Sequence, residues 1–255
     1  MAARTFSIVS LLVIVLAPAL RGEGPEDRIL YPGAARMSFI GPFGGVDNAI
    51  HKGRFTTTEN GILCCAFDEG RGLGPALGVK AFFPVLGVFD FSPRLLYENP
   101  RGEFTAFLQR YPIRGLGNTI ELVDLENKLE VDLHVLTVDL FAAYVFPFAG
   151  VYLAAGPSFG FLLGNHFFKR ETILGPPGVT YLDGTTSQVM YDDSYSLPST
   201  FRAALRGGIG ARIGLSHRVY LNPEILYSHP LTRASKEGEW KYSVLQGTLG
   251  VLISF

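Results

Sequence analysis

Apolar and polar residues alternate along much of this chain with a period of two residues. The clearest case runs from Phe201 to Leu215, where the odd positions are apolar or glycine. The even positions of the same segment carry Arg202, Arg206 and Arg212 among small residues. A helix would scatter these arginines around its circumference, whereas a strand places all three on one face. The pattern therefore predicts a β-strand with one apolar face and one charged face.

The same alternation recurs in other segments, and together they predict about eight strands. The segments are 35–43 (the weakest), 75–85, 89–98, 128–146, 151–163, 201–215, 221–228 and 245–255. We expect an all-β fold, a single antiparallel up-and-down transmembrane β-barrel whose apolar faces meet lipid and whose polar faces meet the lumen. A soluble β-sandwich is the disfavoured alternative.

The connections between these segments alternate in length. Residues 86–88, 147–150 and 216–218 form tight turns, while 44–73, 99–127, 165–198 and 229–241 are long, polar and rich in Gly, Pro and Asp. Short periplasmic turns and longer external loops are typical of outer-membrane barrels. An even strand count then predicts that both termini are periplasmic. We expect an inner aromatic girdle near the tight turns, made of Tyr144, Phe146, Phe148, Tyr152 and Tyr220.

The segment 128–146 is longer than one membrane crossing requires, and its alternation changes phase. Apolar residues occupy odd positions as far as Val135 and even positions from Leu136 onward. A slip of one residue predicts a β-bulge near Val135, and the stretch beyond it is expected to project above the membrane.

The first residues are typical of a secretory signal peptide, expected to be cleaved. Arg4 supplies the positive charge, the segment from Phe6 to Leu16 is apolar, and Ala17-Pro18-Ala19 offers a cleavage site. We expect a signal peptide at 1–19, a periplasmic lead at 20–34 and the barrel at 35–255. The apolar run is too short for a comfortable transmembrane helix. An exported chain that lacks helical spans yet has 47% hydrophobic residues suits a closed barrel.

Composition excludes several classes of function. The formal net charge is −1, so nothing indicates a nucleic-acid partner. The two cysteines, Cys64 and Cys65, are adjacent and cannot build a disulfide framework or a metal cluster. Two thiols in a loop are a simpler interpretation than a redox-active site, and no cofactor is expected.

The C-terminal half carries a family resemblance. The run from Leu133 to Leu163 contains a strand, a tight turn and a strand with Gly-Pro, followed later by Tyr227–Thr232, Trp240 and a last strand that ends on Phe255. This order resembles the PorT-like, OmpA-like outer-membrane β-barrel family of Bacteroidetes-type bacteria. The resemblance implies the barrel fold, an outer-membrane location and contact with outer-membrane lipid. Phe255 also looks like the terminal aromatic that barrel-assembly machinery reads. No activity is implied.

The predicted lumen carries many charges. Such charges must pair, because an isolated buried charge is costly. Arg206 or Arg212 is expected to pair with Glu224 on the next strand. A salt-bridged plug is favoured over an ion path, because an eight-stranded barrel has an interior just wide enough for side chains to fill. The lumen-facing candidates are Arg36, Lys80, Asp90, Arg94, Glu98, Asp139, Arg202, Arg206, Arg212 and Glu224.

Catalytic motifs are absent from the sequence. The five histidines share no motif, and no HExxH, GxSxG or Walker pattern occurs. Asp192, Asp193 and Ser194 could bind a cation or form a protease-like rim, and His166 is close to Asp193 in sequence, but a solvated acidic loop is the simpler interpretation. We therefore expect no enzyme and no metal site.

The long connection 165–198 also holds candidates for external contacts. These are the aromatic residues Phe167, Phe168, Tyr181, Tyr191 and Tyr195. Exposed aromatic residues beside polar ones suit a protein or glycan partner, although the same residues could equally pack the loop. The sequence thus predicts a non-enzymatic barrel with a structural or interaction role. The alternative is a narrow pore for ions or small solutes.

Overall fold

The computed structural model describes residues 37–59, 62–114, 120–147, 150–194, 200–234 and 240–255. The expected signal peptide and periplasmic lead, together with Arg36, Phe148 and Tyr195, lie outside the described residues, as do the side chains of 54–66 with both cysteines. No helix in the part described is long and apolar enough to cross a membrane. The strands are β1 (Phe39–Glu59), β2 (Ile62–Leu86), β3 (Phe89–Glu98), β4 (Gly102–Arg114), β5 (Ile120–Val145), β6 (Val151–Gly175), β7 (Ser187–Asp193), β8 (Phe201–Ala211), β9 (Ile213–Gly214), β10 (Val219–Pro230) and β11 (Lys241–Ser254).

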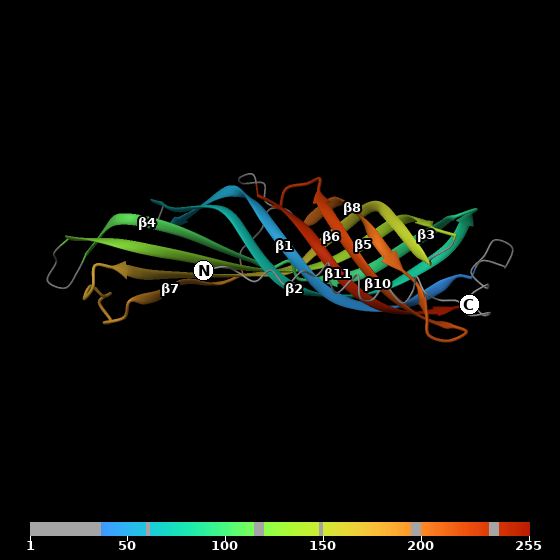
Figure 1. The fold of residues 1–255 in the computed structure, drawn as a ribbon. Coiled ribbons are helices and arrows are strands. Elements are labelled where there is room, and N and C mark those ends of the chain that lie inside the picture. The colour runs from blue at the N-terminus through green and yellow to red at the C-terminus, as the bar shows by residue number, and fades with distance from the viewer. Residues whose placement is uncertain (1–36, 60–61, 115–119, 148–149, 195–199, 235–239) are drawn as a thin grey trace.

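Eight of these strands form a closed ring, which is the right half of Figure 1. The ring order is β1, β2, β3, β5, β6, β8, β10 and β11, and β11 pairs back with β1. Every neighbouring pair is antiparallel, so the predicted all-β fold with about eight ring strands is confirmed. Closure removes the free sheet edges that cannot exist in lipid.

Tight turns connect the ring strands at one end of the barrel, which we call the turn end. The turn between β2 and β3 contains Gly87 and that between β5 and β6 contains Gly150, with φ angles of 49° and 61°. This left-handed backbone costs glycine no steric strain. The two ends of the described chain also meet here, since the Ser38 amide donates to the Phe255 carbonyl (3.3 Å) and the Phe255 amide donates to that of Ser38 (3.0 Å).

At the opposite end the strands continue far past the ring, and this part, at the left of Figure 1, we call the extension. β1, β2, β5 and β6 contain 21, 25, 26 and 25 residues, whereas a tilted membrane strand needs about 9–11. β4 pairs with the distal part of β5, and β7 with that of β6. The prediction of long loops at 44–73, 99–127 and 165–198 is therefore wrong, because most of these residues are in strands.

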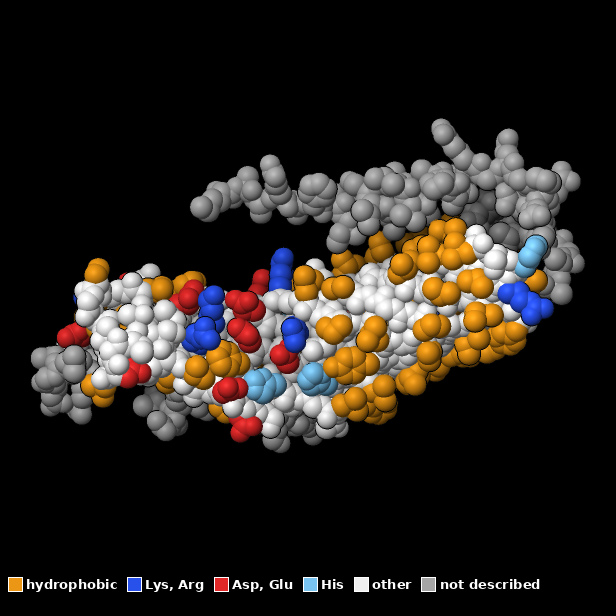
Figure 2. Space-filling model, turned by 90° about the horizontal axis from the view of Figure 1, so that it is seen from below, with side chains coloured by type: hydrophobic (Ala, Val, Ile, Leu, Met, Phe, Trp, Pro, Cys, Tyr) orange, Lys and Arg blue, Asp and Glu red, His pale blue; other side chains and the backbone are white. Residues whose placement is uncertain are grey.

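The outer surface of the ring is covered by exposed apolar side chains, which we call the apolar belt. Figure 2 shows them gathered over one half of the molecule, with charged side chains gathered beyond them. We take residues 39–50, 73–86, 89–98, 135–145, 151–163, 201–214, 219–228 and 244–254 as the membrane-spanning segments. Each ring strand contributes to the belt, for example Val46, Leu77, Leu95, Leu140, Leu153, Leu205, Tyr227 and Leu249.

Strand β5 shows that polarity reverses between ring and extension. Odd-numbered residues face inward along nearly its whole length, without interruption at Val135. In the ring the inward residues include Asp139 and the outward ones include Leu140; in the extension the inward residues include Leu133 and the outward ones Glu130. The irregularity predicted near Val135 is therefore confirmed in position, but not in its cause, because the change of phase within β5 reflects this reversal. A register shift does occur beside Val135, but its extra residue is Leu163 in β6.

Inside the barrel, apolar layers lie on both sides of a charged layer. The layer near the turn end includes Phe82, Phe141 and Tyr152, and the layer toward the extension includes Phe104 and Trp240. Tyr152 and Tyr220 face inward, so they do not belong to the predicted aromatic girdle. On the outer surface at the turn end, Tyr144 instead contacts Phe89 and Phe146, with ring centroids 5.4 and 5.1 Å apart.

Candidate functional site

Ten acidic and basic side chains of the described residues occupy the charged layer of the lumen. Five are acidic and five are basic, so their formal charges cancel. Among the described residues that the sequence predicted to face the lumen, all have side chains that are at least nine-tenths buried. Asp47 was missed, because it lies in a segment that the sequence assigned to a loop. The ten are Asp47, Lys80, Asp90, Arg94, Glu98, Asp139, Arg202, Arg206, Arg212 and Glu224.

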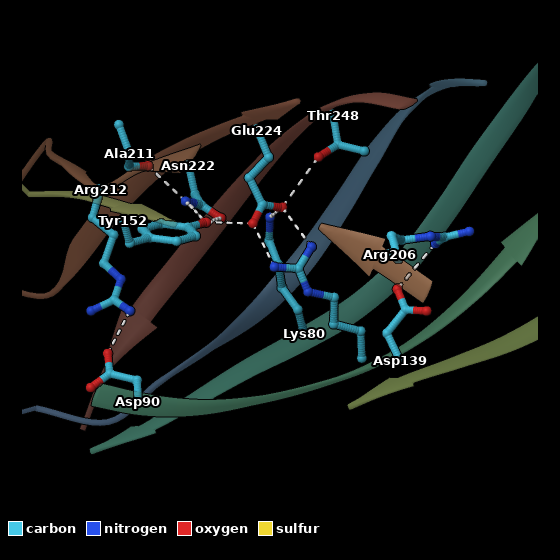
Figure 3. Close-up of polar contacts among 11 residues, drawn as sticks. Lys80, Asp90, Asp139, Tyr152, Arg206, Ala211, Arg212, Asn222, Glu224 and Thr248 are labelled. Atoms are coloured by element: carbon cyan, nitrogen blue, oxygen red, sulfur yellow. Dashed lines mark hydrogen bonds and ion pairs between the residues drawn. The ribbon is translucent and has the colours of Figure 1, made fainter. Parts of the chain in front are cut away.

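Glu224 of β10 is the centre of the first group of contacts, drawn in Figure 3. Its carboxylate accepts hydrogen bonds from Lys80 of β2, from both terminal nitrogens of Arg94 of β3 (2.6 and 3.0 Å) and from the hydroxyl of Tyr152 of β6. The Thr248 hydroxyl of β11 donates a fifth bond, at 3.3 Å. One buried carboxylate thus links strands on opposite sides of the barrel.

Arg206 of β8 is the centre of the second group. It donates to Glu98 of β3 and, at 3.0 Å, to Asp139 of β5. Glu98 also accepts a bond from the Thr137 hydroxyl at 2.7 Å, and Asp47 accepts one from the Gln246 amide at 2.8 Å. Charge-assisted bonds of this kind are the stronger class of hydrogen bond and fix the geometry of the strands that they connect.

Arg212 forms a third contact nearer the turn end, where its guanidinium donates to Asp90 at 2.7 Å. It also lies 4.2 Å from the ring centroid of Phe82. The predicted pairing of Arg206 or Arg212 with Glu224 is therefore wrong. The prediction considered only the neighbouring strand, whereas in a narrow barrel the partners of Glu224 reach it across the lumen, from β2 and β3.

A fourth group lies outside the membrane-spanning segments, where His51 of β1 meets Trp240. The Trp240 indole donates to His51 Nδ1 at 3.1 Å, and His51 Nε2 donates to the Arg101 carbonyl at 2.9 Å. Both bonds require the neutral imidazole with its proton on Nε2. Burial lowers the pKa of His51 from 6.5 to about 4, which keeps it neutral at physiological pH. No periodic signal in the sequence indicates this contact between His51 and Trp240, since Trp240 lies in a predicted loop.

The residues that the sequence proposed as a cation site or protease-like rim are placed as follows on the outer surface. His166 pairs with Asp192 (2.8 Å) rather than with Asp193, and both side chains are exposed. Asp193 instead accepts a bond from the Ser194 amide at 2.6 Å. Among the described residues, no group of three or more His, Cys, Asp or Glu side chains is placed to hold a metal ion.

The aromatic residues that the sequence proposed for external contacts differ in position. Phe167 faces inward and packs on Trp240, so the structure corrects its assignment to an exposed loop. Tyr181 is half-buried and donates to Glu171 at 2.8 Å. Phe168 lies on the outer face of β6 beneath Arg170, and Tyr191 is 37% exposed on β7. Two of the four described candidates therefore remain available for an outside contact.

A closed eight-stranded ring with an apolar belt outside and balanced charges inside defines an integral outer-membrane β-barrel. The sequence profile of the outer membrane protein beta-barrel domain matches residues 40–235, and the chain belongs to this family. It is therefore a protein of the bacterial outer membrane. The profile does not distinguish the PorT-like or OmpA-like groups that the sequence resembles.

Solved structures of other barrels resemble this chain distantly. Neisserial surface protein A is 11% identical, with 86% of this chain and 97% of that chain covered and a TM-score of 0.40. Ail of Yersinia pestis is 10% identical (86% and 100% covered, TM-score 0.28), and OprG from Pseudomonas aeruginosa is 12% identical (86% and 96%, TM-score 0.36). A comparison with curated protein sequences found no match.

Proposed function

We propose that this protein is a plugged barrel that anchors the extension at the cell surface, where the extension contacts a protein or glycan partner. The observation that carries the proposal is the filled lumen. Balanced charges link the strands across it, and apolar layers lie on both sides. Such an interior stabilises a barrel and opposes the passage of solutes.

The orientation in this proposal follows from the two ends of the barrel. Tight turns are typical of the periplasmic side and long projecting segments of the outside. The turn end is then periplasmic and the extension extracellular, which places Ser38 and Phe255, paired at the turn end, on the periplasmic side. Phe255, 69% exposed at the end of the chain, is available as the aromatic signal for barrel-assembly machinery.

The extension offers a surface that suits recognition. Its outer face carries the apolar side chains of Phe107, which lies opposite Glu126, and of Leu122, and farther along β5 the charged Lys128 and Glu130. Exposed aromatic and aliphatic groups with polar neighbours are typical of contact surfaces. A structural role for the ring and a recognition role for the extension thus use different parts of the chain.

Conductance of the refolded full chain in a planar bilayer tests the plug. The expected result is a folded barrel without discrete current steps. Steps of constant size would favour the alternative, a narrow pore for ions or small solutes, and would make the lumen arginines candidates for its selectivity.

Binding to glycan arrays and to surfaces coated with extracellular proteins tests the recognition role. Vesicles that carry the protein are compared with vesicles that carry a variant with Phe107, Phe168 and Tyr191 changed to Ser. A variant with Leu95 and Leu249 changed to Ala, inside the apolar belt, is the matched control. Binding that survives in the surface variant, or is lost equally in both, would contradict the role of this face.

A further inference from the structure

Two lysines lie side by side on the outer surface of the barrel wall. Lys52 of β1 is directly opposite Lys241 of β11, and both side chains are exposed. Residues in such positions have Cβ atoms about 4.5–5.5 Å apart, so that two like charges repel each other and destabilise the strand pair. Both side chains point away from the interior, and the packing of the core therefore does not require this pair.

A third cation lies next to the two lysines. The Ala234 amide donates to the Trp240 carbonyl at 2.8 Å, which brings the backbone of the exposed Arg233 beside that of Lys241. We call Lys52, Lys241 and Arg233 the basic row. Within the described part of the chain, none of these three side chains forms a hydrogen bond or an ion pair.

Strand β2, on the other side of Lys52, does not neutralise the basic row. Glu69 lies opposite Lys52 in the register of β1 and β2, but the two side chains form no ion pair. Asp68 and Arg71 are exposed beside Glu69. Among the described residues, this face thus carries four cations and two carboxylates, and it keeps an excess of positive charge.

The basic row lies just beyond the apolar belt. The membrane-spanning segments end at Ile50 of β1 and at Val244 of β11, and the two lysines are two and three residues past these points. At about 3.3 Å per residue and a strand tilt of about 40°, this places them roughly 5–8 Å above the belt. The headgroup layer on each side of a bilayer is about 5–8 Å thick. The basic row is therefore at the level of lipid headgroups.

We infer that the basic row binds the headgroup of an anionic lipid that carries a phosphate monoester. Such a phosphate has three strong acceptor oxygens, one for each cation of the row, and basic residues near a membrane surface attract anionic lipids. The alkyl chains of the lipid lie against the apolar belt, along the exposed Val46 and Leu245. The orientation proposed above would place this lipid in the outer leaflet, but the site itself does not depend on that orientation.

Native mass spectrometry of the full chain in dodecylmaltoside micelles measures the binding. Dioleoylphosphatidic acid carries the phosphate monoester, and dioleoylphosphatidylcholine has the same chains with a headgroup of zero net charge. Phosphatidic acid should bind about tenfold more tightly, because each cation near an anionic headgroup contributes several-fold. Equal affinities would overturn the inference, since the apolar belt alone would then hold both lipids. Micelles have no sides, so a failure here would leave the proposed orientation untouched.

A pair of double variants separates the basic row from net charge. Lys52→Gln with Lys241→Gln should remove the preference for phosphatidic acid. Arg110→Gln with Arg170→Gln is the matched control, because it removes the same charge from exposed residues of β4 and β6 in the extension. The control should keep the preference. An equal loss in the two variants, or a preference that survives without the lysines, would overturn the site.

A third variant separates lipid binding from a merely structural role. Lys241→Glu places a carboxylate opposite Lys52, so that a repulsive pair becomes an attractive one. Without added lipid, its heat resistance in dodecylmaltoside should rise, while its affinity for phosphatidic acid should fall about tenfold. Lower heat resistance would mean that the lysines serve the barrel alone. That result, or an unchanged affinity, would overturn the inference.

Inorganic phosphate distinguishes the source of the phosphate group. It is added to the complex with phosphatidic acid at concentrations up to a thousand times that of the lipid. Retention of the lipid supports a headgroup site, because the apolar belt holds the alkyl chains as well. Displacement of the lipid would overturn the proposal in favour of a site for free phosphate.

Discussion

The ring and the extension are built from the same strands, yet their side chains are arranged in opposite ways. In the ring, strand β5 turns Asp139 inward and Leu140 outward, whereas in the extension it turns Leu133 inward and Glu130 outward. The backbone alternation is unbroken between them. The surroundings therefore decide which face is apolar: lipid outside the ring forces polar groups inward, and water outside the extension allows the usual apolar interior.

The same difference decides what each ion pair contributes to stability. In the ring, charges such as Glu224 are buried with their partners, so the loss of one partner leaves an uncompensated charge in an apolar surrounding. In the extension, charged pairs such as Arg101–Asp132 lie in water, which screens them. Substitutions of one chemical kind should therefore have very different effects in the two regions.

The largest effect is expected for Glu224→Gln. The change leaves Lys80 and Arg94 in the lumen without their carboxylate partner, so the free energy of unfolding should fall by about 3–5 kcal/mol. Urea unfolding in detergent, followed by the gel shift between folded and unfolded barrel, measures it. The matched control is Glu103→Gln, whose partner Lys128 is 3.6 Å away in an exposed pair and whose loss should cost less than about 1 kcal/mol. Equal losses in the two variants would contradict the comparison.

The second-largest effect is expected when a charge is placed on the outward face of β5. Leu140→Arg puts a charge into the apolar belt and should lower stability by about 2–4 kcal/mol near the middle of the bilayer. Glu130→Arg places the same residue on the same face of the same strand, but in the extension, and should change stability by less than about 0.5 kcal/mol. If both variants inserted and unfolded alike, the boundary between ring and extension would lie elsewhere.

These two regions also explain what the sequence could predict. The ring was predictable because lipid requires an apolar residue at every second position, and this pattern is visible in segments such as Phe201 to Leu215. The extension was not, because its strands alternate with the opposite polarity and less regularly, so that Phe107 and Leu122 stay outside beside charged residues. The reversal at Val135 was visible in the sequence, but a change of polarity and a bulge produce the same phase slip there.

The contacts of the lumen could be predicted only in part. The alternation assigns Lys80, Arg94 and Glu224 to the inward face, which is a property of each strand alone. Their pairing depends on the stagger of strands around the ring, which no local pattern encodes.

A third prediction concerns pH and the contacts of His51 with Trp240 and Arg101, where the ring meets the extension. His51 has a pKa lowered to about 4 in the folded protein, against 6.5 in the unfolded chain. The unfolded chain therefore binds a proton first as the pH falls, and stability is lost between pH 6.5 and pH 4, by up to about 3 kcal/mol. Above pH 6.5 the residue has no such effect.

The matched variant for this test is His51→Gln, which can donate to the Arg101 carbonyl and accept from Trp240 without titrating. Fluorescence of Trp240 during urea unfolding reports on this region in both proteins. The wild type should lose more stability than the variant between pH 6.5 and pH 4, since carboxylates titrate in both. Parallel pH profiles would show that protonation of His51 does not cause the loss of stability between pH 6.5 and pH 4.

The smallest effect is expected for Asp132→Asn in the extension. Asp132 lies 2.5 Å from Arg101, a shorter distance than many pairs inside the lumen, yet the Arg101 side chain is 54% exposed. Water solvates the guanidinium when its partner is removed, so the cost should be about 0–1 kcal/mol and should shrink further at high salt. Urea unfolding at low and high salt checks both statements. A loss near that of Glu224→Gln would mean that distance governs the strength of these pairs, whereas the contrast between the two regions requires that burial does.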